Sequence, residues 1–272
     1  MGLAYQRYGT GEPLVLLHGI GHRWQAWSSV VDRLAPLREL ILVDLPGHGN
    51  SPPMASDGRS VPTILRQSTI SLLDDLGLKR PHIAGSSLGG LLALETAADG
   101  RASSVTAISP AGFWTSVAQL RYAVGVNEAM QAIGHMIRRL GPALSRTTAG
   151  RALIYALIVA RPSRVSPAQA AGDMDAFLNS STAMNAILDA AIPFTDAIPD
   201  DIPVTIAWGT KDRLLLPRQA LMAKERLPQA NLVWLPGCGH VPMTDDPELV
   251  ADVLLQGSRS EPDVAVGPGL PV

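Results

Sequence analysis

The sequence predicts an α/β fold in which a mostly parallel sheet is flanked by helices and interrupted by an inserted helical cap. Three features indicate this class. Short apolar runs of strand length alternate with segments of helical spacing along most of the chain. A long segment rich in Ala and Leu breaks this alternation in the second half. A serine bracketed by glycines stands at one strand-to-helix junction.

Six short apolar runs are typical of buried strands, and segments with apolar residues at helical spacing lie between or after them. The strands are predicted at 14–17, 39–44, 82–86, 105–109, 203–208 and 231–235. The helices of the core are predicted at 24–34, 64–76, 88–98, 217–227 and 247–255. Strands that alternate with helices are joined by crossovers, so this sheet is expected to be parallel and covered on both faces.

The stretch 112–199 has no clear strand pattern and carries Ala, Leu, Ile and Met at helical spacings. Within it, Ser166 followed by proline is typical of a helix N-terminus. We interpret this stretch as a helical cap inserted into a core of residues 1–111 and 200–256. A plain helical elaboration of the fold is the alternative. Residues 257–272 show little apolar periodicity, which predicts a disordered tail.

Composition excludes several classes of function. The 272 residues include 22 Lys and Arg against 24 Asp and Glu, a balance that does not favour a polyanion partner such as nucleic acid. A single cysteine, Cys238, excludes an intrachain disulfide and a Cys-rich zinc site. No apolar run is long enough to span a membrane or to form a signal peptide core, so we expect a cytoplasmic protein.

The most specific motif is a serine, Ser87, which follows the strand predicted at 82–86 and opens the next helix. Gly85 and Gly89 stand two residues before and after it, in the pattern G-x-S-x-G. So sharp a turn strains the central residue, and the glycines let strand and helix approach closely. The Ser87 hydroxyl would then be exposed at a helix N-terminus, as a nucleophile requires. The alternative is that Ser86 and Ser87 only cap the helix.

A serine hydroxyl is a weak nucleophile at neutral pH and needs a general base, for which His240 is the best candidate. It ends the loop 237–240, which carries two glycines and follows the last predicted strand. Other histidines have less specific explanations. His82 opens an apolar strand, His135 lies in the inserted helices and His48 lies in a turn.

The imidazole needs an acid to fix its tautomer, and Asp212 is the best placed carboxylate. It lies in the turn after the strand predicted at 203–208, at the carboxyl end of that strand. Four other carboxylates nearby either precede that strand or are expected to cap the last helix: Asp200, Asp201, Asp245 and Asp246.

The order nucleophile, acid, base along the chain is that of α/β-hydrolases, and not that of chymotrypsin or subtilisin. The segments 18–21, 43–51, 209–217 and 237–240 also match motifs of that family. To about residue 256 the chain therefore resembles the α/β-hydrolase family, in the serine-nucleophile branch with a helical cap. A serine in place of an aspartate argues against haloalkane dehalogenases and epoxide hydrolases of this fold.

The resemblance implies an oxyanion hole built from the backbone N–H groups of Ile20 and Leu88. His18 and Gly19 would shape the loop that carries the first donor. Each donor of this kind is typically worth about 10²–10³ in rate. The resemblance implies no metal and no organic cofactor.

We expect hydrolysis of a carboxylic ester of a small to medium apolar substrate through an acyl-enzyme. Ser87, deprotonated by His240, would attack the ester carbonyl, and water activated by His240 would release the acid. The cap would supply an apolar pocket. Four methionines would suit an adaptable wall of it, although ordinary helix core is the preferred interpretation of any single one: Met130, Met136, Met174 and Met184.

Three other functions stay open, all with a small molecule as partner. One is hydrolysis of a carbon–carbon bond, as in the meta-cleavage branch of the family. Its carboxylate substrates would call for a cap arginine: Arg121, Arg138, Arg139, Arg161 or Arg164. A cofactor-free haloperoxidase or perhydrolase would use the same triad with peroxide. A non-catalytic ligand-binding module is the remote alternative. The sequence indicates no oligomeric state.

Overall fold

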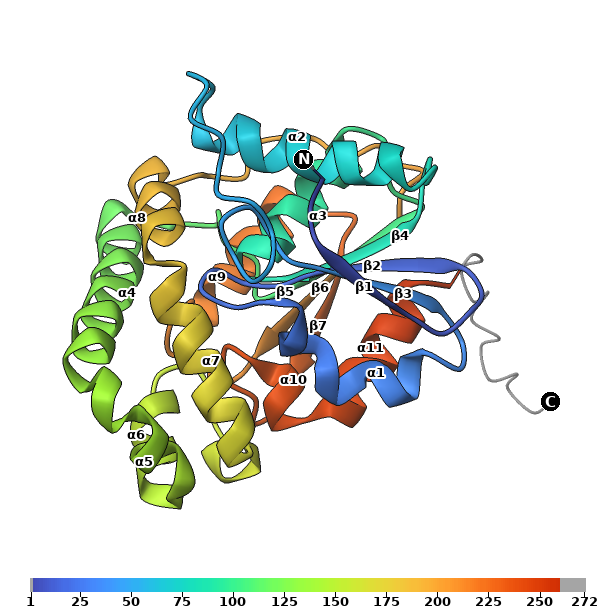
Figure 1. Ribbon diagram of the computed structural model, residues 1–272. Coiled ribbons are helices and arrows are strands. Elements are labelled where there is room, and N and C mark those ends of the chain that lie inside the picture. Colours follow the sequence, from blue (N-terminus) through green and yellow to red (C-terminus); the bar gives the residue numbers. More distant parts are fainter. Residues whose placement is uncertain (1, 260–272) are drawn as a thin grey trace.

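A computed structural model describes residues 2–259, so the tail predicted at 257–272 lies almost wholly outside the described residues. Within them, a seven-stranded sheet has the order β1-β3-β2-β4-β5-β6-β7 (Figure 1). The strands are β1 (Tyr5–Tyr8), β2 (Pro13–Leu17), β3 (Glu39–Val43), β4 (His82–Ser86), β5 (Ser104–Ile108), β6 (Val204–Gly209) and β7 (Asn231–Leu235). β1 pairs antiparallel with β3 and the other pairs are parallel. The predicted mostly parallel sheet is confirmed.

The strand β1 is absent from the sequence prediction, whereas the other strands lie within one residue of their predicted bounds. β1 reads Tyr-Gln-Arg-Tyr, its side chains are mostly exposed, and it forms one edge of the sheet. An apolar run marks a strand that is buried on both faces. A solvent-facing edge strand has no such run and gives no signal of this kind.

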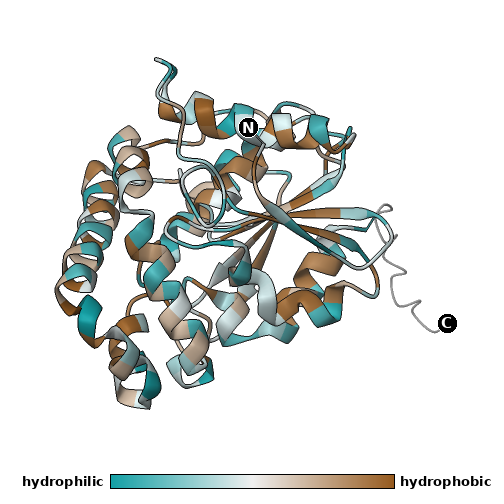
Figure 2. Ribbon diagram, viewed as in Figure 1, coloured by the Kyte–Doolittle hydropathy of each residue, from teal (hydrophilic) through white to brown (hydrophobic). Residues whose placement is uncertain are grey.

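Helices cover both faces of the sheet. The core helices are α1 (Ser28–Leu34), α2 (Val61–Asp75), α3 (Leu88–Ala98), α9 (Arg218–Arg226), α10 (Pro242–Asp245) and α11 (Pro247–Gly257). A short 3-10 helix, η1 (Trp24–Trp27), comes directly before α1. Side chains of β2 alternate between two apolar clusters, because successive residues of a strand point to opposite faces. Val15 and Leu17 pack with residues of α2, α3 and α9, whereas Leu14 and Leu16 pack with residues of α1 and α11. Figure 2 shows the resulting apolar strands at the centre.

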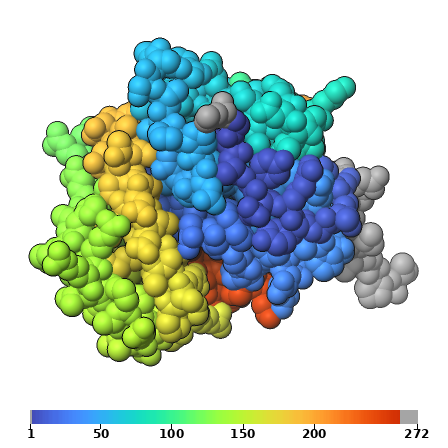
Figure 3. Space-filling model, viewed as in Figure 1, coloured from blue at the N-terminus to red at the C-terminus, as the bar shows by residue number. Residues whose placement is uncertain are grey.

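All regular secondary structure between β5 and β6 is helical. It contains α4 (Val117–Ile137), η2 (Arg138–Leu140), α5 (Gly141–Arg146), α6 (Thr148–Tyr155), η3 (Pro162–Arg164), α7 (Pro167–Asn179) and α8 (Ser181–Ala190). As predicted, Ser166 caps α7, and its side chain accepts a hydrogen bond from Gln169 N–H. These helices gather on one side of the molecule, green to gold in Figures 1 and 3. The bounds 112–199 for a cap stay a prediction.

No helix in residues 2–259 combines the length and the apolar character that crossing a membrane demands.

Candidate active site

Ser87 lies at the tip of the turn that joins β4 to α3. Its backbone has φ 55° and ψ −116°, a left-handed conformation that a residue with a side chain rarely adopts. Its side chain makes no capping hydrogen bond to the helix, which argues against a mere helix cap. The predicted strand–turn–helix context is confirmed, and the strain is of the kind found where function requires it.

The two glycines around Ser87 are required by close packing. A Cβ added to Gly85 would lie 2.0 Å from the carbonyl oxygen of Gly89. A Cβ on Gly89 would lie 2.1 Å from the carbonyl oxygen of Leu17 in β2. Both contacts are with backbone atoms, which cannot move away as the end of a flexible side chain can. Only glycine therefore lets α3 start this close to the sheet.

The structure brings Asp212 and His240 together. Asp212 follows β6 and His240 follows β7, and Asp212 Oδ2 lies 2.8 Å from His240 Nδ1. The other oxygen, Oδ1, accepts hydrogen bonds from the backbone N–H groups of Leu214 and Leu215, each at 2.9 Å. A carboxylate only accepts here, so His240 carries its proton on Nδ1 and keeps a lone pair on Nε2.

Hydrogen bonds join the loop that carries Asp212 to the loop that carries His240. Lys211 N–H donates to the carbonyl of Cys238, and Gly237 N–H donates to Thr210 Oγ1, both at 2.8 Å. Cys238 is buried between them, and burial raises the pKa of its thiol to about 11. A thiol of this kind stays protonated near neutral pH, so Cys238 serves as a small packing residue.

Ser87 and His240 line one cavity, together with His22, Met130 and others. Among the hydrogen bonds that residues 2–259 form, none joins the Ser87 hydroxyl to His240. Catalytic hydrogen bonds are often long before substrate binds, so this spacing does not exclude proton transfer between the two.

The loop after β2 lies directly against Ser87. A Cβ on Gly19 would lie 3.2 Å from Ser87 Cβ and 3.9 Å from Ser87 Oγ. The next residue, Ile20, lines the cavity with Ser87 and Leu88. In the described part of the chain, the backbone N–H groups of Ile20 and Leu88 have no protein acceptor. Both amides are therefore free to bind an oxyanion, and the oxyanion hole itself stays a prediction.

Two buried histidines brace that loop. His18 Nδ1 lies 2.8 Å from the carbonyl of Gly19, and its Nε2 accepts from Leu45 N–H at 3.0 Å. His48 Nε2 accepts from Gly21 N–H at 3.1 Å. Burial keeps the pKa of His18 well below its usual value and lowers that of His48 to about 4. Both rings are neutral at physiological pH and act as supports.

Two cavity residues were not found by sequence reasoning. His22 lines the cavity of Ser87 and His240, and burial lowers its pKa. Asn127, on α4, is only 6% exposed and also lines it. A polar residue on the apolar face of a predicted helix was the available signal for Asn127. Of the four methionines expected in the pocket walls, Met130 lines the cavity, whereas Met136 is 78% exposed.

The prediction that Asp245 caps the last helix is wrong. Asp246 caps α11 by accepting from Leu249 N–H. Asp245 is fully buried and accepts from Gly239 N–H at 2.7 Å, Ala160 N–H at 3.0 Å and Arg161 N–H at 2.6 Å. It therefore ties the His240 loop to the connection between α6 and η3.

Asp245→Ala should lower the free energy of unfolding by about 3 kcal/mol, because three buried amides lose a charged acceptor. Asp246→Ala, which removes a single capping bond, should cost only about 1 kcal/mol. Urea denaturation of both variants followed by circular dichroism measures the difference. Equal losses would show that the bonds of Asp245 contribute no more than a helix cap.

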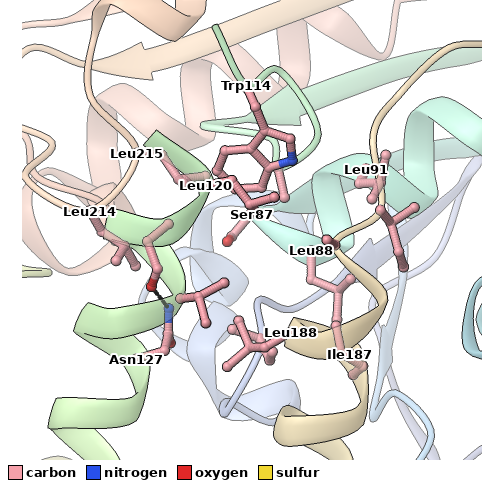
Figure 4. A pocket seen from close by; sticks show the side chains of 16 residues that line it. Ser87, Leu88, Leu91, Trp114, Leu120, Asn127, Ile187, Leu188, Leu214 and Leu215 are labelled. Carbon is pink, nitrogen blue, oxygen red and sulfur yellow. Dashed lines mark hydrogen bonds between the residues drawn. The ribbon is translucent and has the colours of Figure 1, made fainter. Parts of the chain in front are cut away.

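A second cavity adjoins the first at Ser87 and extends between α3, α4 and α8 (Figure 4). Its walls are almost entirely apolar, with residues from α3, α4, α8 and the loop after β6: Leu91, Leu120, Val124, Ile187, Leu188, Leu214 and Leu215. Neither cavity has an arginine or lysine in its lining. In residues 2–259, no group of three His, Cys, Asp or Glu side chains is arranged to hold a metal ion.

Known proteins share this sequence pattern and this fold. A model of the alpha/beta hydrolase family matches residues 14–253. The chain is 27% identical over 247 residues to Lipase 3 of Moraxella sp., covering 87% of this chain and 74% of the lipase. A thermophilic esterase from Thermogutta terrifontis superposes with a TM-score of 0.69 at 21% identity, covering 93% and 91% of the two chains. A meta-cleavage product hydrolase from Pseudomonas fluorescens superposes with a TM-score of 0.71 at 19% identity, covering 93% and 92%.

The family match spans most of the chain and both halves of the core, including the segments of Ser87, Asp212 and His240. The protein therefore belongs to the alpha/beta hydrolase family of enzymes.

Proposed function

We propose that the protein hydrolyses carboxylic esters through an acyl-enzyme on Ser87. The observation that carries this proposal is the alignment of three groups. A serine on a strained turn shares a cavity with an imidazole, and Asp212 holds the opposite nitrogen of that ring. The names of relatives such as Lipase 3 of Moraxella and Lipase 1 of Psychrobacter immobilis support ester chemistry.

The chemistry proceeds in two steps. His240 Nε2 takes the proton of Ser87 Oγ as that oxygen attacks the ester carbonyl, and the imidazolium returns the proton to the departing alcohol. Water then enters, gives a proton to His240 and attacks the acyl-enzyme, which releases the acid and restores the serine. Asp212 stabilises the imidazolium that forms in both steps.

The backbone N–H groups of Ile20 and Leu88 receive the negative charge of the tetrahedral intermediate. Neither group has a protein acceptor in the described residues, so neither must break a bond to do so. His18 and His48 support this site by holding the loop through Leu45 and Gly21.

The lining of the cavities favours an ester over the carboxylate-bearing substrate of a carbon–carbon hydrolase. That substrate calls for a cation, and no arginine of the cap reaches either cavity. Arg161 and Arg164 donate to the backbone carbonyl of Asp245 instead. An apolar acyl or alcohol group fits walls of leucine, isoleucine and valine.

The size of the site predicts a preference for short chains. The two cavities have volumes of about 60 Å³ and about 40 Å³, well below the roughly 300–1,000 Å³ of sites for drug-sized ligands. In a series of p-nitrophenyl esters from acetate to palmitate, kcat/KM should peak at or below hexanoate. Palmitate should be slower by about 100-fold, since its chain would have to displace the cap.

A matched pair of variants tests whether the walls set this optimum. Leu188→Ala enlarges the apolar cavity and should move the optimum to longer chains. Leu221→Ala removes the same atoms from an exposed position on α9 and should leave the optimum in place. Equal rates on butyrate and palmitate in the unmodified protein would contradict the assignment of these cavities to the acyl or alcohol group.

A further inference from the structure

We propose that the natural ester carries a hydroxyl group within a few atoms of the scissile carbonyl, and that Asn127 binds this hydroxyl. The inference rests on the proposed ester hydrolysis and names its substrate class more closely.

The first observation is the place of Asn127. It projects from α4 and lines both cavities that meet at Ser87. Figure 4 shows its side chain and Ser87 at the same pocket. Besides Asn127, the residues common to both linings are Ile20, Ser87 and Leu214. These mark the junction of the cavities, so a group bound by Asn127 is close to the bond that Ser87 attacks.

The second observation is the orientation of the Asn127 amide. Its Nδ2 donates to the carbonyl of Ala123 at 2.8 Å, one turn earlier in α4. A carbonyl oxygen only accepts, so the atom that faces Ala123 must be the nitrogen, and the usual ambiguity of an amide flip is removed. In the described part of the chain, Oδ1 has no donor. An acceptor is therefore left for a bound ligand.

The third observation is the contrast with the rest of the wall. An amide oxygen without a donor in an apolar pocket costs desolvation free energy, and it opposes the binding of a purely apolar chain. Leucine would suit such a chain better and has nearly the same size. One turn later on the same helix, Gln131 is also buried, and its Nε2 donates to Asn185 Oδ1 at 3.1 Å. Its Oε1 also has no donor in the described part of the chain, but Gln131 lines neither of the two cavities. Of these two amide oxygens, only that of Asn127 belongs to a residue that lines both cavities together with Ser87.

A hydroxyl is the neutral group that fits this position best. It donates to Oδ1 and can also accept from the second N–H of the same amide. Two sources have this chemistry: a hydroxyl on the acyl chain, or one on the alcohol that leaves. Ethyl 3-hydroxybutyrate and 2-hydroxyethyl butyrate represent the two, with ethyl butyrate as the unsubstituted reference.

The experiment is pH-stat hydrolysis of these three esters by the full-length protein. At least one hydroxylated ester should exceed ethyl butyrate by about tenfold in kcat/KM, the gain expected from one buried hydrogen bond. The ester with the higher kcat/KM shows whether Asn127 binds a hydroxyl of the acyl part or of the alcohol part. Equal kcat/KM on all three esters would overturn the inference while leaving ester hydrolysis intact. Turnover of none of them would instead contradict the proposed function together with the inference.

Two variants locate the effect. In Asn127→Leu the ratio of kcat/KM for the hydroxylated ester to kcat/KM for ethyl butyrate should fall to about one. Gln131→Leu removes an amide of similar burial on the same helix, outside both cavities, and should keep the ratio. An unchanged ratio in Asn127→Leu overturns the inference. If a variant fails to fold, the comparison of the three esters on the unmodified protein still tests the inference.

Discussion

Replacement of Ser87 by alanine should lower kcat for ester hydrolysis by about 10⁴–10⁶, to the rate left by binding and the oxyanion donors alone. The variant loses the only atom that forms the acyl-enzyme. The backbone of the turn should persist, because its positive φ is imposed by the sheet and by the close contact of Gly85 with Gly89. The loss should therefore appear in kcat with little change in stability.

The neighbouring serine provides the control. Ser86 is buried at the end of β4, and Ser86→Ala removes a hydroxyl of the same kind one residue away. Rates on p-nitrophenyl butyrate and thermal melting of both variants separate chemistry from folding. Activity of Ser87→Ala within tenfold of the unmodified protein would refute the acyl-enzyme. A fluorophosphonate that labels the unmodified protein and Ser86→Ala, but not Ser87→Ala, would identify the nucleophile independently.

The sequence predicts the strand–turn–helix geometry at Ser87 because the constraints on it are local. A short strand, two glycines and a helix are all contained in residues 82–98. The structure adds the physical reason, since Gly89 must clear the carbonyl of Leu17 in a neighbouring strand. Asp212 and His240 are predicted for a related reason. In a parallel sheet, residues after successive strands reach the same edge, whatever their distance in sequence.

The residues that sequence reasoning misplaced depend on contacts between distant segments. Asp245 and Asp246 are adjacent and alike, and either could cap α11. Their roles differ because Ala160 and Gly239 come within reach of Asp245 alone. Asn127 is similar, since it lines the same cavity as Ser87, which lies forty residues earlier in the sequence. No local pattern carries this information.

Asp212→Asn should lower kcat by roughly 10⁴ through a change of tautomer at His240. In the structure, Oδ1 of Asp212 accepts from the N–H groups of Leu214 and Leu215. An asparagine must keep its oxygen at that position, because its NH₂ cannot accept from either amide. Its NH₂ group is then turned toward His240 and donates to Nδ1, which must become an acceptor. The proton of the neutral ring moves to Nε2, and Nε2 can no longer take the proton of Ser87.

A second variant separates the effect of the Asp212 charge from the effect of its geometry. Asp212→Ala leaves His240 Nδ1 without either partner, so the ring can still adopt the productive tautomer for part of the time. Its activity should therefore match or exceed that of Asp212→Asn, although alanine is the larger change. Asp200→Asn, at the opposite end of β6, should have no effect on kcat and controls for the loss of one carboxylate. If Asp212→Asn retained more than a tenth of the activity, the orienting role of Asp212 would be wrong. The NH₂ group of the asparagine would then have to face the amides of Leu214 and Leu215, with its oxygen toward His240. A ¹⁵N spectrum of the His240 ring would reveal which nitrogen carries the proton.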